Sequence, residues 1–449
     1  MKDDLYRADG EDKISSVTTP PRPTWTDLGG NRFAWRGRGH PDGTRFDARF
    51  EVRVDGGTVA PTADGFKIAG ANGVTILMTV GTDFRGADPA TRGQRDLDAL
   101  AGQAPETLRA AHIADYQALF RRVTLNLGRT RSAEMPTNRR IWSQMWGAQD
   151  NRVDQTKDRN PDLFALHFQF GRYLMIASSR PGTLPPALQG LWNDSLLPMW
   201  YGQHTSDINV EMNYWPAETT NLAECHSALL DLIESFVPAG RDAARHAYGA
   251  RGLVLHGMTN WGPKDSEGGW RDFAPWLARH FWEHYEFSGD RDFLAKHAYP
   301  FMKECALFYF DTLVRDPRTG KLVTAPSYSP ENRFLASDDG KPASLDVGNT
   351  MGMAICRDLF RNSLRAEGIF GRDAAFGEEL KAKLAALAPY PIGQDGRLLE
   401  WRADYPETEL GHRHNSHLYP LYPGDEITPR GTPAFADAAK KALQLTSKP

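Results

Sequence analysis

The sequence predicts a mainly α-helical fold, a toroid of helical hairpins preceded by a small antiparallel β-domain. Two patterns lead to this prediction. From Asp162 onward apolar residues recur at helical spacing, and no intervening segment is a strand long enough to build a parallel sheet. Before residue 85, apolar and polar residues alternate with the period of two that is typical of antiparallel strands. A helical solenoid is the alternative, but it needs a sequence repeat, and the sequence has none.

The β-domain is expected over residues 31–104. In residues 46–55 apolar side chains alternate strictly with charged ones, which indicates a half-buried strand with one apolar and one charged face. Residues 55–57, Asp-Gly-Gly, supply a turn. Three or four strands make a poor independent core, so we expect this domain to be incomplete at its N-terminus. The preceding residues 1–30 are polar and rich in Pro, Thr and Asp, and we expect them to be poorly ordered.

Helical patterns follow the β-domain. Residues 105–160 are expected to form a helical linker, with a helix in 106–123 and a polar loop in 128–160 that contains Pro136. Residues 161–449 are expected to form the helical toroid, with the working residues on the loops at one end. Its helices are predicted at 162–178, 217–247, 272–287, 291–315, 348–366, 372–388 and 434–445.

Composition excludes several partners. The chain has 449 residues and a net charge of -4, so it lacks the basic field that holds a nucleic acid. Its apolar runs are too short to cross a membrane, and the first thirty residues carry no signal peptide pattern. Cys225, Cys305 and Cys356 lie far apart in apolar helical patterns, so we interpret them as buried thiols and not as a disulfide framework or a metal site.

The segment 184–218 is the strongest candidate for a binding site. It mixes aromatic rings with amide and carboxylate groups, which suits a sugar because rings cover its C–H faces and polar groups take its hydroxyls. A core aromatic cluster with satisfied amides is the alternative. The candidates in this segment are Trp192, Asn193, Trp200, Tyr201, His204, Asp207, Asn209, Asn213, Tyr214 and Trp215.

Three later loops carry further candidates. In residues 325–332 two prolines stiffen a loop that presents Glu331, a position where a carboxyl can serve as a general acid. Residues 399–404 place Glu400 and Asp404 around Trp401, and residues 411–419 include His412, His414 and His417. A turn, a solvated loop and a packed histidine cluster are the respective alternatives. Because no helical Glu or distant Cys completes a ligand set with these histidines, we predict no metal and no cofactor. Trp261, Trp270, Trp276 and Trp282 are either core residues or walls of the site.

Several of these segments together resemble a known family. They are GRYL with SSRPG, LPPALQGLWN, INVEMNYWPAE, WEHYEFSGD, PSYSPEN and HRHNSHLYPLYPG. The combination is similar to glycoside hydrolase family 95, which contains inverting α-L-fucosidases and related α-L-galactosidases. The resemblance runs from about Phe46 to about Ala439 and implies a β-sandwich-like N-terminal domain, a helical linker and an (α/α)6 catalytic barrel. It also implies that Glu331 is the general acid.

In that family an Asn-Ile-Asn triplet holds the attacking water beside a base Asp. The matching residues here are Asp207-Ile208-Asn209, so Asn209 carries over while an Asp replaces the first Asn. This additional carboxylate can act as a base itself or can repel the family's base. Thr205 stands where fucose-specific members often carry His and members that prefer L-galactose carry Thr, and its smaller side chain would leave room for a C6 hydroxyl.

The resemblance further indicates a fragment truncated at both ends. The family's base lies in a segment like QIDGNFG beyond the histidine loop, and Pro449 is reached before it, before the last helical hairpin of the barrel and before a C-terminal β-domain. We therefore expect the chain to aggregate, or to associate with another chain through exposed apolar surface. The sequence leaves the compartment unknown, and the family suggests a periplasmic or secreted full-length protein.

The leading hypothesis is hydrolysis of terminal α-L-fucosyl or α-L-galactosyl linkages by inversion, on an oligosaccharide or glycan substrate. Glu331 would be the acid, water would be held near Asn209, and Asp207 and Asp404 are the candidate bases within the chain. The predicted substrate-binding residues are Trp192, Asn193, His204, Thr205, Trp215, Trp401, Asp404, His412 and His414. A non-catalytic carbohydrate-binding remnant is one alternative. Another helical-toroid enzyme, such as a glycoside phosphorylase, would need a basic phosphate pocket that the sequence does not indicate.

Overall fold

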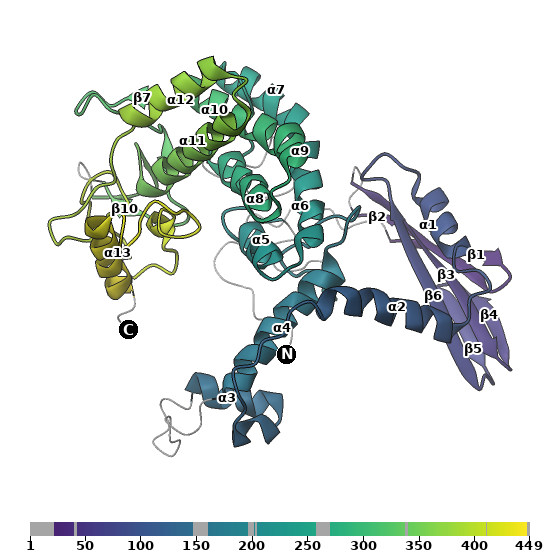
Figure 1. Ribbon diagram of the computed structural model, residues 1–449. Helices are drawn as coiled ribbons and strands as arrows, with labels where there is room; N and C mark the ends of the chain where they lie inside the picture. The colour runs from purple at the N-terminus through teal and green to yellow at the C-terminus, as the bar shows by residue number, and fades with distance from the viewer. Residues whose placement is uncertain are drawn as a thin grey trace. The chain divides into compact units, whose positions relative to one another are not determined.

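The computed structural model describes residues 22–39, 43–146, 160–195, 202, 204–256, 270–336, 340–409 and 411–446 (Figure 1). The chain divides into two compact units, Met1–Gln117 and Ala118–Pro449. The first unit is built on an antiparallel sheet, and the second consists mainly of helices. The fold is therefore mainly α, a helical toroid preceded along the chain by an antiparallel β-region and a helical linker, as the sequence predicts.

The sheet of the first unit has four strands in the order β1-β2-β3-β6. The strands are β1 Thr24–Gly29, β2 Arg32–Arg38, β3 Arg45–Asp55 and β6 Gly73–Thr82, while β4 Thr58–Thr62 and β5 Gly65–Ala69 form a separate hairpin. The alternating segment 46–55 lies within β3 and pairs with β6 along its whole length. The expectation of poor order up to residue 30 is wrong for β1, because the Trp25 ring packs against Trp35 and Phe50 and anchors the strand. Residues 1–21 lie outside the described residues.

The alternating pattern predicts that the apolar face of the sheet is buried and the charged face is exposed. In the structure a helix covers the charged face. Helix α1 (Pro89–Asp98) packs against β3 and β6 and covers the charged face. Asp47 and Arg49 are buried there and form an ion pair of 2.9 Å. On the apolar face, Phe66 of β5 packs on Phe33 and Phe50, while Ile76 and Met78 of β6 are exposed. The apolar face is thus covered in part and open at β6.

Helices connect the sheet to the toroid along the chain. They are α2 Pro105–Phe120, the short η1 Arg131–Glu134, α3 Thr137–Trp146 and α4 Pro161–Ser178. The predicted loop at 128–160 is therefore wrong in part, because it contains η1 and α3. Pro136 stands directly before α3, where its missing N–H group interrupts no helical hydrogen bond. The Asn160 side chain accepts a hydrogen bond from the Leu163 N–H at 3.3 Å and caps the start of α4.

Helix α4 is fixed in the second unit by a buried arginine. The Arg172 side chain is 1% exposed, and its guanidinium donates to the carbonyl oxygens of Leu119, Phe120 and Thr220. A buried guanidinium is tolerated only when its N–H groups find acceptors, and these carbonyls supply them. The contact joins the end of α2, α4 and the turn before α6.

Most toroid helices lie close to their predicted positions, but most of α5 lies in a segment where no helix was predicted. The toroid helices are α5 Asn209–Thr219, α6 Ala223–Ser235, α7 Val237–Tyr248, α8 Phe273–Ser288, α9 Arg291–Phe293, η5 Leu294–Ala298, α10 Tyr299–Thr312, α11 Thr350–Phe370, α12 Ala374–Ala386 and α13 Pro433–Thr446. The single helix predicted at 217–247 is wrong, because the chain breaks twice there. Asn221 adopts a left-handed conformation with φ of 59° before α6, and Pro238 lies in the first turn of α7, where a new helix starts readily.

Helices α8, α10 and α11 form the centre of the core (Figure 1). Phe281 of α8 stacks on Phe301 of α10 with ring centroids 4.8 Å apart. Phe310 of α10 packs against Phe360 of α11 at 5.3 Å. The three cysteines are buried and free, as predicted. None of the helices in the described ranges is long and apolar enough to span a bilayer.

Between α10 and α11 the chain forms three short antiparallel pairs in place of helices. They are β7 Val314–Arg315 with β8 Leu322–Val323, β9 Ser327–Tyr328 with β12 Leu345–Asp346, and β10 Phe334–Leu335 with β11 Pro342–Ala343. The loop that carries Glu331 runs from β9 to β10, so strand pairing anchors it on both sides. The segment 387–432, which includes the short helix η6 (Ser416–Leu418), is mostly irregular and packs beside it.

The central role of Phe360 leads to a stability prediction. Its side chain is fully buried against Tyr309 and Phe310, so Phe360→Ala should lower the free energy of unfolding by about 3–5 kcal/mol through lost burial and a cavity. The matched control is Phe287→Ala at the end of α8, where the ring is 55% exposed and the change should stay within about 0.5 kcal/mol. Urea unfolding followed by circular dichroism measures both, and equal losses would show that the α8–α10–α11 core is wrongly identified.

Candidate active site

A cavity of ≈ 430 Å³ lies where three helices of the second unit begin. Asp207 and Ile208 line it just before α5, Trp276 lines it from the first turn of α8, and Met351 from the first turn of α11. The segment 413–423 forms the remaining wall. Its volume is within the range that small ligands occupy in proteins. Because helix N-termini carry partial positive charge, the three helix starts favour anionic side chains here.

Asp207 lines this cavity, and its carboxyl group lies close to that of Glu331. The Asp207 side chain is 5% exposed. Burial, followed by the negative charge of Glu331, raises the pKa of Asp207 to about 6.

Glu331 also has basic neighbours. Arg413 donates a hydrogen bond to Glu331 Oε2 and forms an ion pair with it. His414 Nε2 lies 4.0 Å from the same oxygen, and burial lowers the pKa of this histidine. Arg413 and His414 both line the cavity together with Asp207. The cavity wall therefore contains one carboxyl group with a raised pKa, one guanidinium and one imidazole, which is a set suited to proton transfer.

The buried Glu400 carboxyl group accepts two hydrogen bonds from the loop that presents Glu331. Ser329 Oγ donates to Glu400 Oε1 at 2.6 Å, and Asn332 Nδ2 donates to Glu400 Oε2 at 2.8 Å. Glu400 is 3% exposed, and burial raises its pKa to about 7 although these two hydrogen bonds oppose the rise. On the other side, Ser416 Oγ donates to the Pro330 carbonyl. The residues before and after Glu331 are thus fixed by three side-chain hydrogen bonds.

The Asp-Ile-Asn triplet lies at the start of α5. Val210 N–H donates to the Thr205 carbonyl at 2.9 Å, which folds the triplet into the first turn. Thr205 is 8% exposed, and its hydroxyl oxygen has no hydrogen-bond partner among the described residues. Asn209 is half-buried and is not part of the cavity wall, although Asp207 and Ile208 are.

Aromatic side chains form much of the cavity wall. Trp215 of α5 packs edge-on against Tyr422 with ring centroids 4.8 Å apart, and both rings line the cavity. Trp276 contacts Tyr419 at 5.5 Å and is 2% exposed, so it forms the base of the cavity. This pairing of rings with a carboxyl group is the combination that the sequence indicated for a sugar site.

Other predicted binding residues lie away from this cavity. Trp192 lines a second cavity of ≈ 340 Å³ between α4 and α5, and its ring packs on Tyr173 at 6.1 Å. Asn193 closes a local turn by donating to the Ser195 carbonyl. His204 bonds the Pro185 carbonyl through Nε2 at 3.0 Å, and burial lowers its pKa. Trp200, Tyr201 and Trp261 fall outside the described residues.

The predicted contacts of Trp401 and Asp404 with the substrate do not match their positions. Trp401 is 1% exposed and packs on Phe334 at 4.8 Å, so it is a core residue under the Glu331 loop. Asp404 accepts hydrogen bonds from Arg397 and from the Gln394 N–H, in an exposed loop. Neither residue lines the main cavity.

The three histidines after residue 411 pack around Glu400 and Glu331. The rings of His412 and His414 lie 5.3 Å apart, and burial lowers the pKa of both. His417 is 7% exposed, and burial lowers its pKa to about 4. All three histidines line a small cavity with Glu400, and His414 also lines the main cavity. This arrangement agrees with the packed histidine cluster that the sequence left open.

The structure adds one residue to the site that sequence reasoning did not select, and it gives a position to another. Arg413 pairs with Glu331, and Glu400, which the sequence offered only as a carboxylate beside Trp401, holds the Glu331 loop. Arg413 stands between two histidines, so it was overlooked beside more conspicuous neighbours. The signal that could have found Arg413 is its position as the only formally charged side chain among residues 411–419.

Comparison with known proteins agrees with this geometry. The sequence profile of the Glycosyl hydrolase family 95 catalytic domain matches residues 104–447. Alpha-L-fucosidase 2 of Arabidopsis thaliana is 35% identical over 422 residues, which cover 90% of this chain and 49% of that protein. Probable alpha-fucosidase A of Aspergillus niger is 32% identical over 354 residues, which cover 76% of this chain and 42% of that protein. The chain spans about half the length of the curated relatives it matches.

A solved structure supports the fold. The protein named "Putative kojibiose phosphorylase from human microbiome" superposes with a TM-score of 0.55 over 92% of this chain and 53% of its own, at 9% sequence identity. At that identity the likeness concerns the fold alone. The profile match and the two relatives identify the family directly: the chain belongs to glycosyl hydrolase family 95.

Proposed function

We propose that the protein hydrolyses terminal α-L-fucosyl or α-L-galactosyl linkages by inversion, with Glu331 as the general acid. The observation that carries the proposal is the position of Glu331, which sits on a loop fixed by three side-chain hydrogen bonds. Its ion-pair partner Arg413 lines the cavity that Trp215 and Tyr422 also line. The fucosidase names of the two relatives support the substrate class. Thr205, with its small buried side chain at the start of α5, supports room for a C6 hydroxyl and thus for L-galactose.

The contact between Asp207 and Glu331 determines how roles are assigned. An inverting pair of carboxyl groups needs about 6.5–9.5 Å between them, because the sugar and the attacking water lie between acid and base. Asp207 and Glu331 lie too close together to leave such a gap, because the charge of Glu331 raises the pKa of Asp207. We therefore propose that Asp207 shares a proton with Glu331 and is not the base. Asp404 is held in a separate exposed loop, so its position does not support a base role either.

Sharing a proton would serve acid catalysis. A general acid must be protonated when the glycosidic oxygen leaves, and the pKa of Asp207 at about 6 means that the pair retains a proton up to that pH. Arg413, also on Glu331, offsets the negative charge that appears once the proton has been given up. Water near Asn209 would attack from the opposite sugar face, as the family resemblance implies. The Ile208 and Trp215 side chains would cover the apolar side of the sugar.

Glu331→Gln tests the acid assignment. The amide preserves the side-chain shape but cannot donate the proton, so kcat/KM for an α-L-fucosyl disaccharide should fall by about 100-fold or more. The loss should be much smaller with a dinitrophenyl α-L-fucoside, because that leaving group departs without protonation. Glu409→Gln, an exposed carboxyl on the neighbouring segment, is the control.

Three outcomes separate the competing functions. Unchanged disaccharide turnover in Glu331→Gln would show that the acid assignment is wrong. Calorimetric binding of fucose by the unmodified chain without any release of sugar from either substrate would identify a carbohydrate-binding remnant. Product release that requires inorganic phosphate would identify a glycoside phosphorylase, the activity named for the structurally similar protein.

Glu400→Gln tests how the loop is held. The glutamine presents an N–H₂ group where Glu400 accepts a hydrogen bond, so either Ser329 or Asn332 loses its acceptor. A buried donor left unpaired costs about 1–3 kcal/mol, and the free energy of unfolding should fall by that amount. Hydrogen exchange of the backbone at 327–334 should accelerate, whereas exchange in α10 should not. An effect spread evenly over both segments would contradict a specific link to the Glu331 loop.

Asp207→Asn should change how stability depends on pH. The folded-state pKa of Asp207, about 6, lies above the unfolded value of about 3.9. The native state therefore binds the proton more tightly, and this group's contribution to stability is lost as pH rises from about 4 to about 6. Asparagine does not ionise, so the variant should gain about 2–3 kcal/mol relative to the unmodified chain between pH 4 and pH 7. Urea unfolding at both pH values measures this, and a pH-independent difference would show that Asp207 is not a buried, coupled acid.

A further inference from the structure

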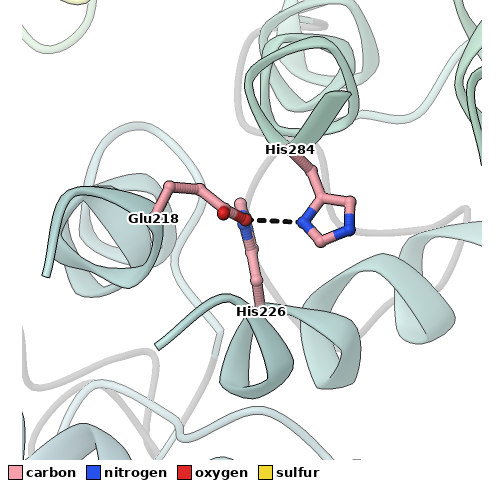
Figure 2. Close-up of side chains that lie close together, drawn as sticks. All are labelled: Glu218, His226 and His284. Carbon is pink, nitrogen blue, oxygen red and sulfur yellow. Dashed lines mark hydrogen bonds and ion pairs between the residues drawn. The ribbon is translucent and has the colours of Figure 1, made fainter. Parts of the chain in front are cut away.

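Three helices of the toroid bring a carboxylate and two imidazoles together away from the cavity. Glu218 lies at the end of α5, His226 in the first half of α6 and His284 in the second half of α8. In Figure 2 the three side chains converge on one point, with the Glu218 carboxylate between the two rings. Glu218 Oε1 lies 2.8 Å from His226 Nδ1 and 2.6 Å from His284 Nδ1.

The Glu218 carboxyl group has only imidazole rings as ion-pair partners among the described residues. Glu218 and His226 are buried, and His284 is partly buried. In the described part of the chain, no Lys or Arg forms an ion pair with Glu218, whose side chain is 2% exposed. A buried carboxylate without a permanent cation is costly, so the site favours an added positive charge.

We propose that Glu218, His226 and His284 bind one divalent transition metal ion of the zinc type. Two imidazole nitrogens and one carboxylate oxygen form a donor set that zinc accepts in proteins, with a fourth position left for water. Magnesium and calcium prefer all-oxygen ligands, so two imidazoles disfavour them. His284, with a side chain 19% exposed, is the ligand through which an ion and its water would reach the site.

A second layer of residues supports the same geometry. His226 Nε2 lies 2.9 Å from His280 Nδ1, so an ion bound at His226 Nδ1 leaves the ring proton on Nε2, facing an acceptor. The Tyr214 ring stacks on His226 with centroids 5.5 Å apart and planes 18° apart, which fixes the orientation of the imidazole. Metal-ligating histidines in proteins commonly have such a partner on the second nitrogen.

Ion binding requires a small adjustment. Donor atoms that share a tetrahedral ion at bonds of about 2.0–2.1 Å lie about 3.3 Å apart. The O–N distances of 2.8 Å and 2.6 Å here are those of hydrogen bonds, so each must lengthen by about half an ångström. His284 is the less buried ring and can make that shift. The ion would tie α5, α6 and α8 together, and α5 begins at the triplet that contributes Asp207 to the cavity.

The direct test is metal binding by the purified, chelator-treated chain. Isothermal titration with Zn²⁺ should show one saturable site, and Zn²⁺ should raise the melting temperature relative to the same sample in chelator. Co²⁺ in place of Zn²⁺ should give the visible absorption of a tetrahedral or five-coordinate ion. X-ray absorption at the zinc edge should show two imidazole ligands, and this measurement needs no variant.

Two variants assign the binding to this cluster. Glu218→Gln and His284→Gln should each weaken Zn²⁺ binding by more than the roughly 10- to 100-fold that loss of an outer partner costs a metal site. His297→Gln is the matched control, because it removes an exposed His–Glu pair with Glu234 at 2.7 Å and should leave the affinity unchanged. His412→Gln tests for binding by the histidine cluster near Glu400 and should also have no effect.

The outcomes decide the proposal without any activity measurement. Circular dichroism confirms that each variant is folded before titration. The proposal is overturned if the folded chain shows no saturable Zn²⁺ binding, if X-ray absorption shows fewer than two imidazoles, or if binding is lost in His412→Gln and kept in His284→Gln. In those cases the cluster is a hydrogen-bonded link between helices and nothing more.

Discussion

The hydrogen bonds from Ser329 and Asn332 to the buried Glu400 are the interaction on which the site depends. They fix the residues on either side of Pro330-Glu331. The Glu331 loop therefore cannot move without breaking a buried hydrogen bond to Glu400. Glu400 itself is fixed because its segment packs in the core through Trp401. The general acid we propose is therefore positioned by core packing, although it lies on a loop. A rigid scaffold that presents a working residue on a loop is the usual division of labour in enzymes.

Helix α5 links the two functional sites that we propose. Its N-terminal end follows Asp207, which meets Glu331, and its C-terminal end carries Glu218, which joins His226 and His284. One rigid helix thus has a carboxyl group at each end in contact with a different part of the toroid. Any rotation of α5 would disturb both contacts, so each end restrains the other.

The sequence predicted a large part of the fold. Strict alternation in residues 46–55 identified β3, and helical spacing identified most toroid helices to within a few residues. Both signals are patterns among neighbouring residues, so they can be recognised in a single sequence. Four features were missed: the helix breaks at Asn221 and before Pro238, the helix at 137–146, and the burial of Trp401. The sign of the backbone angle φ and burial by tertiary packing do not show in the local pattern of residues. The Glu218 cluster was missed for the same reason, since Glu218 and His284 are 66 residues apart.

Asp207 stands where the family has an Asn, so the family resemblance alone does not assign its role. The resemblance left open whether the extra carboxylate serves as a base or repels one. We propose a third possibility, a shared proton, because Asp207 is buried and the charge of the nearby Glu331 helps to raise its pKa to about 6. In this proposal Arg413 offsets the charge left after proton transfer, since it forms an ion pair with Glu331. Asp207, Glu331 and Arg413 would then act as one unit, and the effect of changing any one of them would depend on the other two.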